Sequence, residues 1–253
     1  MDLTLFCDTY IIAEYLRLKA VISNMARYNT GMHKGFQVIR SYSGNGSNII
    51  RHETRITGKN ANLVERKYSE YNLCNGKFTS FKEELYRRHL PVPTGFRFIR
   101  DPSRFDVNAW NQFNECSNPY EVNTDYYDDF GNNVRSRGEM IVGNALKELG
   151  LEAKYEPSLK LKGSRRKSPD YSFPVRILDR CFFVEFIGKT DDRDYLDSNF
   201  GKLDEYLQNG VLPNRDLILI CGTEKWLPSQ EAVKRIVSSF INNAVLSTYS
   251  KNI

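Results

Sequence analysis

The sequence predicts an α/β fold in which a mixed central sheet is flanked by helices. Two near-continuous apolar runs, residues 181–187 and 216–221, are typical of strands buried on both faces. Amphipathic segments with helical periodicity lie between and after them, at residues 194–208 and 230–245. Strands and helices that alternate in this way indicate a layered α/β domain.

A helix at residues 136–149 is expected to open this domain. Ser136 can cap it, Glu139 stands three residues later as in a capping box, and Gly150 can end it. The strands expected next lie at residues 152–161 and 170–173. The predicted order from this helix onward is therefore α-β-β-β-α-β-α.

The first sixty residues predict a helix followed by a hairpin. Apolar residues recur at helical spacing over residues 5–26. Two β-prone runs, residues 36–39 and 49–56, surround Asn45-Gly46, and Asn-Gly between such runs is a strong hairpin signal.

Residues 60–90 are rich in helix-forming side chains, and Asn75-Gly76 is expected to split them into two helices. A Pro-, Asn- and Asp-rich stretch follows, which suggests a connector whose aromatic residues pack against another part of the chain. The predicted organisation is an N-terminal helical and hairpin region that binds substrate or a partner, a connector and a core domain, at residues 1–90, 91–133 and 134–253.

The composition limits the class of protein. Hydrophobic residues make up 40% of the chain and aromatic residues 13%, which is enough for a packed core. A net charge of +5, from 36 basic and 31 acidic residues, permits nucleic-acid binding without requiring it. Five scattered cysteines without a CxxC pair argue against a zinc site and against a disulfide framework. Acidic residues interrupt the first apolar stretch, so no signal peptide or membrane span is expected, and we predict a soluble cytoplasmic protein.

Two carboxylates interrupt the apolar strands. Glu185 stands in the middle of residues 181–187, where an uncompensated carboxylate costs several kcal/mol. Asp170 stands at the entrance of the preceding strand, so the two acids can lie side by side across the sheet. Such oxygen ligands suit Mg²⁺ or Mn²⁺, which can activate a bound water and neutralise charge on a phosphate. Glu139 faces inward on the first helix, and the cap and a third acidic arm of the site are equally good explanations for it.

This ordered set resembles the PD-(D/E)XK nuclease superfamily, and most closely a group of poorly characterised bacterial and phage members. The motifs that carry the resemblance are Arg135-Ser136-Arg137-Gly138-Glu139, Tyr155-Glu156-Pro157, Pro169-Asp170-Tyr171, Val184-Glu185-Phe186-Ile187-Gly188, and Tyr195 through Lys202 to Tyr206. The resemblance implies a restriction-endonuclease-like αβββαβ core and a Mg²⁺- or Mn²⁺-dependent nuclease that acts on DNA, in a phage, mobile-element or host-defence setting. Glu139, Asp170 and Glu185 would then be the catalytic and metal-binding acids. The oligomeric state is left open, with a homodimer as one option by family analogy, because cleavage of two strands by such cores often needs one.

One position departs from the family pattern. Ile187 stands where the family has a lysine, so either another lysine supplies the charge or the site is degraded. Lys202 is the preferred catalytic substitute, since in some members the lysine has moved to the following helix. Its helix face also carries Tyr195, Asn199 and Tyr206. Lys189 is the alternative that lies nearer in the sequence.

Basic residues around these motifs are expected to contact backbone phosphates, although a solvated surface would also explain them. They are Arg135, Arg137, Arg165, Arg166 and Lys167. Glu156, beside Pro157, has two explanations: a secondary acidic residue of the site or, as favoured here, a surface residue of its strand.

Three functions remain open from the sequence. The first is the metal-dependent nuclease. The second is a catalytically inactive nuclease fold that binds nucleic acid or protein. The third is a structural α/β protein in which Glu185 pairs with an arginine and no cation binds.

Overall fold

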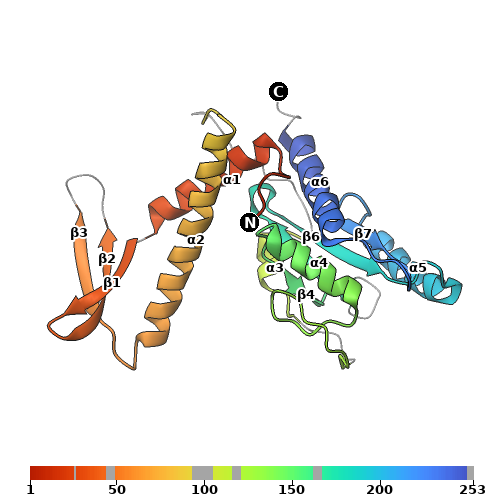
Figure 1. The fold of residues 1–253 in the computed structure, drawn as a ribbon, viewed down its shortest axis with the longest axis horizontal. Coiled ribbons are helices and arrows are strands. Elements are labelled where there is room, and N and C mark those ends of the chain that lie inside the picture. The colour runs from red at the N-terminus through yellow and green to blue at the C-terminus, as the bar shows by residue number, and fades with distance from the viewer. Residues whose placement is uncertain (26, 44–48, 93–104, 116–120, 162–166, 250–253) are drawn as a thin grey trace. The chain divides into compact units, whose positions relative to one another are not determined.

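The computed structural model describes residues 1–25, 27–43, 49–92, 105–115, 121–161 and 167–249 (Figure 1). The chain forms two compact units. The C-terminal unit comprises Met1–Tyr10 and Arg97–Ile253, and the N-terminal unit comprises Ile11–Phe96. No helix within the described ranges is long and apolar enough to cross a membrane.

The C-terminal unit is built on a four-stranded mixed sheet of order β4-β5-β6-β7. β4 and β5 are antiparallel, as are β5 and β6, whereas β6 and β7 are parallel and are connected through α5. The strands are β4 (Lys154–Tyr155), β5 (Tyr171–Val175), β6 (Arg180–Ile187) and β7 (Leu217–Cys221). The helices are α3 (Val107–Asn111), α4 (Arg137–Glu148), α5 (Arg193–Gln208) and α6 (Gln230–Tyr249), with a 3₁₀ turn, η1, at Arg176–Leu178. The predicted α/β class and the predicted order of elements are confirmed.

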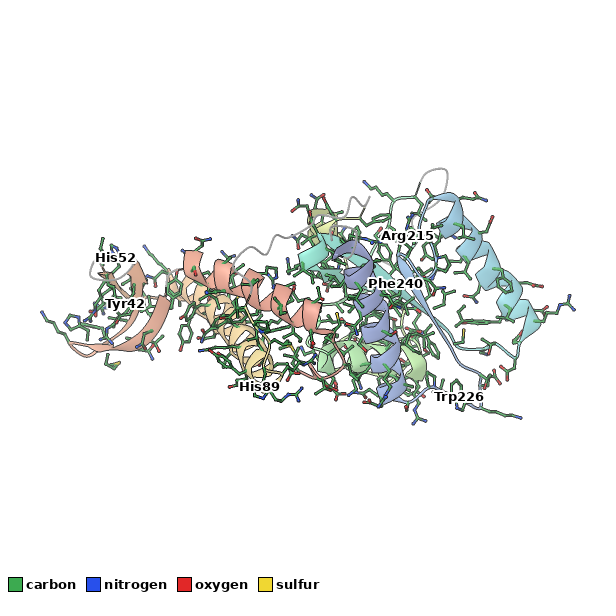
Figure 2. The ribbon with its side chains drawn as sticks, turned by 90° about the horizontal axis from the view of Figure 1, so that it is seen from above. Tyr42, His52, His89, Arg215, Trp226 and Phe240 are labelled. Atoms are coloured by element: carbon green, nitrogen blue, oxygen red, sulfur yellow. The ribbon has the colours of Figure 1, made fainter. Side chains whose placement is uncertain are left out.

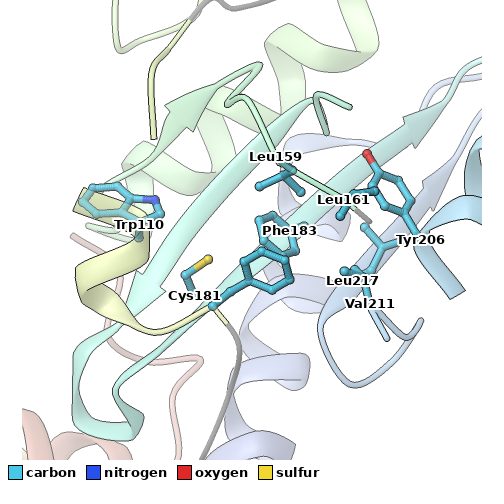
Figure 3. Close-up of a cluster of buried hydrophobic side chains, with 9 residues drawn as sticks. Trp110, Leu159, Leu161, Cys181, Phe183, Tyr206, Val211 and Leu217 are labelled. Atoms are coloured by element: carbon cyan, nitrogen blue, oxygen red, sulfur yellow. The ribbon is translucent and has the colours of Figure 1, made fainter. Parts of the chain in front are cut away.

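Both faces of β6 are covered, which explains its apolar sequence. All eight residues of the strand are buried. On one face the ring of Phe182 meets Phe240 of α6 edge to face, with centroids 5.1 Å apart. Figure 2 labels Phe240 on that helix. On the other face Phe183 belongs to a cluster of nine buried residues that includes Tyr206 of α5 (Figure 3).

Part of the predicted connector belongs to this core. Phe105 and Trp110 lie in the cluster around Phe183, and the indole of Trp110 donates to the Ser172 hydroxyl at 3.2 Å. The packing expected for the aromatic residues of this stretch is thus confirmed for Trp110 and for Phe113, which packs against the cluster. Tyr126 and Tyr127 are exposed instead, and Tyr120 lies outside the described residues.

The strand predicted at residues 152–161 is mostly wrong. Only Lys154–Tyr155 pairs with the sheet. Glu156 has a φ of 42°, in the left-handed region, so it cannot continue the strand, and Pro157 has no amide to donate. Leu159 forms only an isolated bridge, to Lys167.

The N-terminal unit contains a three-stranded antiparallel sheet of order β1-β2-β3. Its elements are α1 (Asp8–Asn24), which begins in the C-terminal unit, β1 (Arg27–His33), β2 (Phe36–Ser43), β3 (Ile50–Arg55) and α2 (Ala61–Arg87). The predicted hairpin strands do pair, as β2 and β3, although Asn45 and Gly46 themselves lie outside the described residues. β1 was not predicted. It joins β2 through Lys34 and Gly35, whose positive φ values of 49° and 80° suit a two-residue hairpin turn.

The prediction of two helices at residues 60–90 is wrong, because α2 is one helix of 27 residues. Gly76 costs a helix about 1 kcal/mol relative to alanine, which is too little to break it. The hydroxyl of Thr79 donates to the Asn75 carbonyl at 2.9 Å within the helix. Buried Phe81 and Leu85 fix its C-terminal half by packing.

Candidate active site

Three carboxylates, one within a strand and two directly beside strand ends, lie in one row across the sheet of the C-terminal unit. Tyr171 of β5 pairs with Val184 of β6, so Asp170, one residue earlier, stands beside Glu185. The amide of Glu156, directly after β4, donates to the Asp170 carbonyl at 2.9 Å and extends the row. The predicted neighbourhood of Asp170 and Glu185 is therefore present in the structure.

Glu185 is held by two side chains of α5. Its side chain is only 6% exposed, its Oε2 accepts from Lys202 Nζ at 2.8 Å, and its Oε1 accepts from the Tyr206 hydroxyl at 2.7 Å. Burial raises the pKa of Glu185 above its usual range, although Lys202 and Tyr206 oppose this shift. Burial alone would lower the pKa of Lys202, but the carboxylates of Glu185 and Asp170 raise it, so the ammonium stays charged.

Asp170 is fixed by the backbone of the neighbouring strand. Its Oδ2 accepts from the Phe186 amide at 2.6 Å. Burial, and then the negative charge of Glu185, raise the pKa of Asp170 to about 7. Lys202 and the amide oppose this rise without cancelling it. Ionised Asp170 is thus unfavourable next to Glu185 unless a further positive charge is present.

Glu139 is both a capping residue and a neighbour of this row. The Ser136 hydroxyl accepts from the Glu139 amide at 3.1 Å and donates to its Oε1 at 2.9 Å. Its Oε2 accepts from the Tyr155 hydroxyl at 2.7 Å and from the Arg135 amide at 3.1 Å. Burial, and then the charge of Asp170, raise the pKa of Glu139 to about 7. The two explanations of Glu139 from the sequence are therefore compatible.

Glu156 is the residue of this group for which the sequence favoured a surface position over a role as a secondary acid. It is 5% exposed, so the expected surface position is wrong. Arg135 binds it with two nitrogens, Nε to Oε1 at 2.7 Å and Nη2 to Oε2 at 3.3 Å. Burial here follows from the pairing of β4 with β5, and nothing in the local sequence signals it.

The structure separates the two candidate lysines. Lys202 contacts Glu185, whereas Lys189 pairs with Glu224 at 2.9 Å and its side chain is 48% exposed. Ile187, where the superfamily that the sequence resembles has a lysine, is buried. The lysine that contacts Glu185 therefore lies on α5 and not on β6.

The basic residues expected at phosphates have different surroundings. The Arg135 guanidinium is bound to Glu156 and to the carbonyl of Glu121, while Arg137 is exposed at the start of α4. Lys167 pairs with Glu205 at 2.9 Å. Arg165 and Arg166 lie outside the described residues.

The donor chemistry of the row suits a hard divalent cation, because every acidic side chain here offers carboxylate oxygens. In this arrangement, however, protein donors hold both oxygens of Glu185 and one oxygen of Asp170. In the part of the chain that the structure describes, no three His, Cys, Asp or Glu residues are grouped so as to hold a metal ion. A cation at this site would therefore share the oxygens of Glu185 with Lys202 and Tyr206 or displace one of these donors.

Comparison with known proteins adds no relative to this picture. No family model, no curated protein and no solved structure matches the chain.

Proposed function

We propose that this protein is a Mg²⁺- or Mn²⁺-dependent nuclease with a PD-(D/E)XK-type core, and that DNA is its substrate. The observation that carries the proposal is the row in which buried Glu185 lies beside Asp170 and binds Lys202 at 2.8 Å. A paired acid on adjacent strands together with a lysine is the combination that the sequence resemblance requires.

The charges of the cluster support a divalent cation. Four acids take part in it, and Lys202 contacts Glu185 while Arg135 contacts Glu156. If all four acids are ionised, four negative charges lie close together in a buried setting. Such a setting is costly, and the raised pKa values of Asp170 and Glu139 express that cost. A bound divalent cation would lower this cost.

The proposed roles follow from the positions of the side chains. Asp170 and Glu185 would hold the cation, and Glu139 would reach it through water or a second ion. The cation would lower the pKa of a bound water and neutralise charge on the scissile phosphate. Lys202, released from Glu185, would orient the attacking water or stabilise the charge that develops on the phosphate.

A second candidate function is a catalytically inactive nuclease fold that binds nucleic acid or protein. The observation that favours it is that both carboxylate oxygens of Glu185 already accept hydrogen bonds, one from Lys202 and one from Tyr206. Buried Ile187 in place of the family lysine points the same way.

A cleavage assay decides between the two. Plasmid, linear duplex, single-stranded DNA and RNA are incubated with EDTA, Mg²⁺ or Mn²⁺, using the wild type, Asp170→Asn and Glu185→Gln. Asp204→Asn is the matched control, because Asp204 is an exposed acid on α5. We expect cation-dependent cleavage that falls roughly a hundredfold or more in both site variants and is unchanged in the control. A wild type that binds no cation and cuts nothing would leave the binding module as the better explanation.

A further inference from the structure

The positive charge of this protein is concentrated in the N-terminal unit. Residues Ile11–Phe96 contain 14 Lys and Arg against 6 Asp and Glu, a net charge of +8. The remaining 22 basic and 25 acidic residues give the C-terminal unit a net charge of −3. The unit with the candidate active site is thus mildly acidic, and the N-terminal unit carries the excess of positive charge that attracts a polyanion.

One face of the β1-β2-β3 sheet carries three of these arginines and one acid among its described side chains. The register pairs Arg40 with Glu53, and Tyr42 with Arg51, so these residues share a face. Tyr28 lies on the opposite face, where it meets Tyr71 of α2 with ring centroids 6.0 Å apart. The described charged and aromatic residues at positions on the first face, here called the arginine face, are His33, Phe36, Arg40, Tyr42, Arg51, Glu53 and Arg55.

The described side chains of the arginine face leave an excess of positive charge. Glu53 is the acid among these positions, and it accepts from Arg40 at 3.0 Å and from Arg51 at 2.5 Å, with His33 as a third partner. These donors lower the pKa of Glu53 to about 2, and the hydrogen bond from Arg51 has the largest effect. The low pKa is consistent with positively charged surroundings. Two arginines thus share one carboxylate, and Arg55 adds a third positive charge.

The face also offers exposed rings and guanidinium groups. The guanidinium of Arg55 lies over the ring of Phe36, 3.3 Å from its centroid, and Phe36 is 44% exposed. The Arg51 side chain is 53% exposed. Tyr42 is half-buried beside them (Figure 2). Arg51 and Arg55 lie on the same face of β3, so both guanidinium groups can bind phosphates of one nucleic-acid strand.

We propose that the arginine face binds the phosphate backbone of a nucleic acid, without sequence preference. Guanidinium groups bind phosphate oxygens through two parallel hydrogen bonds, and flat exposed rings can stack on unpaired bases. The assignment of this surface to the substrate rests on the proposed nuclease function. Binding by the face itself does not, because it needs neither the cation nor the acids of the other unit.

The test measures binding separately from cleavage. Fluorescence anisotropy is recorded in EDTA over a series of salt concentrations, with labelled single-stranded DNA, its duplex and an RNA strand. The variants are Arg51→Gln alone, because its side chain is exposed, and Arg51→Gln with Arg55→Gln. The matched control removes two charges elsewhere in the same unit, through Lys67→Gln with Lys82→Gln, both exposed on α2. Circular dichroism checks that every variant is folded.

We expect the Arg51/Arg55 variant to bind about tenfold more weakly at low salt, with a salt dependence shallower by roughly one to two charges. Arg51→Gln alone should show about half of this effect, and the lysine control much less. Equal losses in the arginine and lysine variants, or none in either, would overturn the proposal. If the wild type binds through this face but cuts nothing with Mg²⁺ or Mn²⁺, the nuclease proposal fails and the binding surface stands. If the wild type cuts nucleic acid while the arginine variants bind normally, the binding proposal fails and the nuclease proposal stands.

Discussion

Lys202 and Glu185 lie 2.8 Å apart in the C-terminal unit, on a helix and a strand that are separated by 17 residues of sequence. The lysine side chain is 27% exposed and the glutamate side chain 6%, so the pair is largely shielded from water. The ammonium contacts Glu185 Oε2, one of the oxygens that would bind the proposed cation. Lys202 therefore stabilises the ionised Glu185 when no cation is bound, and it would compete with the proposed cation for the same carboxylate.

Lys202→Met should therefore separate cation binding from cleavage. We expect cleavage to fall roughly a hundredfold, because no ammonium remains near the phosphate. The affinity for Mn²⁺, measured by calorimetry, should be maintained or increased, because Glu185 no longer has to release an ion pair. Lys189→Met is the control, since Lys189 pairs with Glu224 instead. Equal loss of cleavage in both lysine variants would contradict the assignment.

The pH dependence of stability should carry the signature of Asp170. Its pKa is raised from 3.8 to about 7, so its contribution to stability is fully present below pH 3.8 and is lost as the pH rises toward 7. In EDTA, Asp170→Asn should therefore gain stability over the wild type as the pH rises, by roughly 1–2 kcal/mol at pH 8. Urea denaturation at several pH values measures this difference.

Saturating Mg²⁺ provides the check on this prediction. Cation binding should stabilise the wild type at high pH and leave Asp170→Asn largely unaffected. A stability difference between the two proteins that does not change with pH would show that Asp170 is ionised at little cost.

The Arg135–Glu156 pair is expected to be structural. Arg135→Met leaves the 5%-exposed Glu156 carboxylate without its guanidinium and should cost about 3 kcal/mol in urea denaturation. The double variant Arg135→Met with Glu156→Gln should recover part of this loss. Arg137→Met, at an exposed position in the same turn, should change stability by less than about 0.5 kcal/mol. A loss of DNA binding without loss of stability in Arg135→Met would instead support the phosphate contact expected from the sequence.

Gly138 should be intolerant of a side chain. A Cβ at this position of α4 would lie 1.9 Å from the Phe186 ring, so the ring and the strand beside Glu185 would have to move. Gly138→Ala should destabilise the protein by about 1–3 kcal/mol. Gly201→Ala in α5, where nothing lies within 4 Å, should stabilise it by up to about 1 kcal/mol. Thermal unfolding of the two variants compares them directly, and equal shifts would rule out the packing explanation.

Local chemistry was sufficient for several features of this protein. The apolar run of β6 predicted a strand buried on both faces, because only such a strand can be apolar at every position. Ser136 and Glu139 predicted the start of α4, because a cap depends on residues three positions apart. Local chemistry led to a wrong prediction at Gly76, where a break between two helices was expected. The packing of Phe81 and Leu85 outweighs the helix penalty of glycine, which is about 1 kcal/mol.

The arrangement of the site depended on contacts between distant segments. The sequence by itself predicted that Asp170 stands at the entrance of one strand and Glu185 in the middle of the next, since period and composition are properties of each segment. Only the tertiary structure decided that Glu156 is buried in the same row and that Lys202, not Lys189, contacts Glu185. Strand register and helix docking bring these side chains together. Both depend on the free energy of the whole fold, and the sequence of a single segment does not determine that free energy.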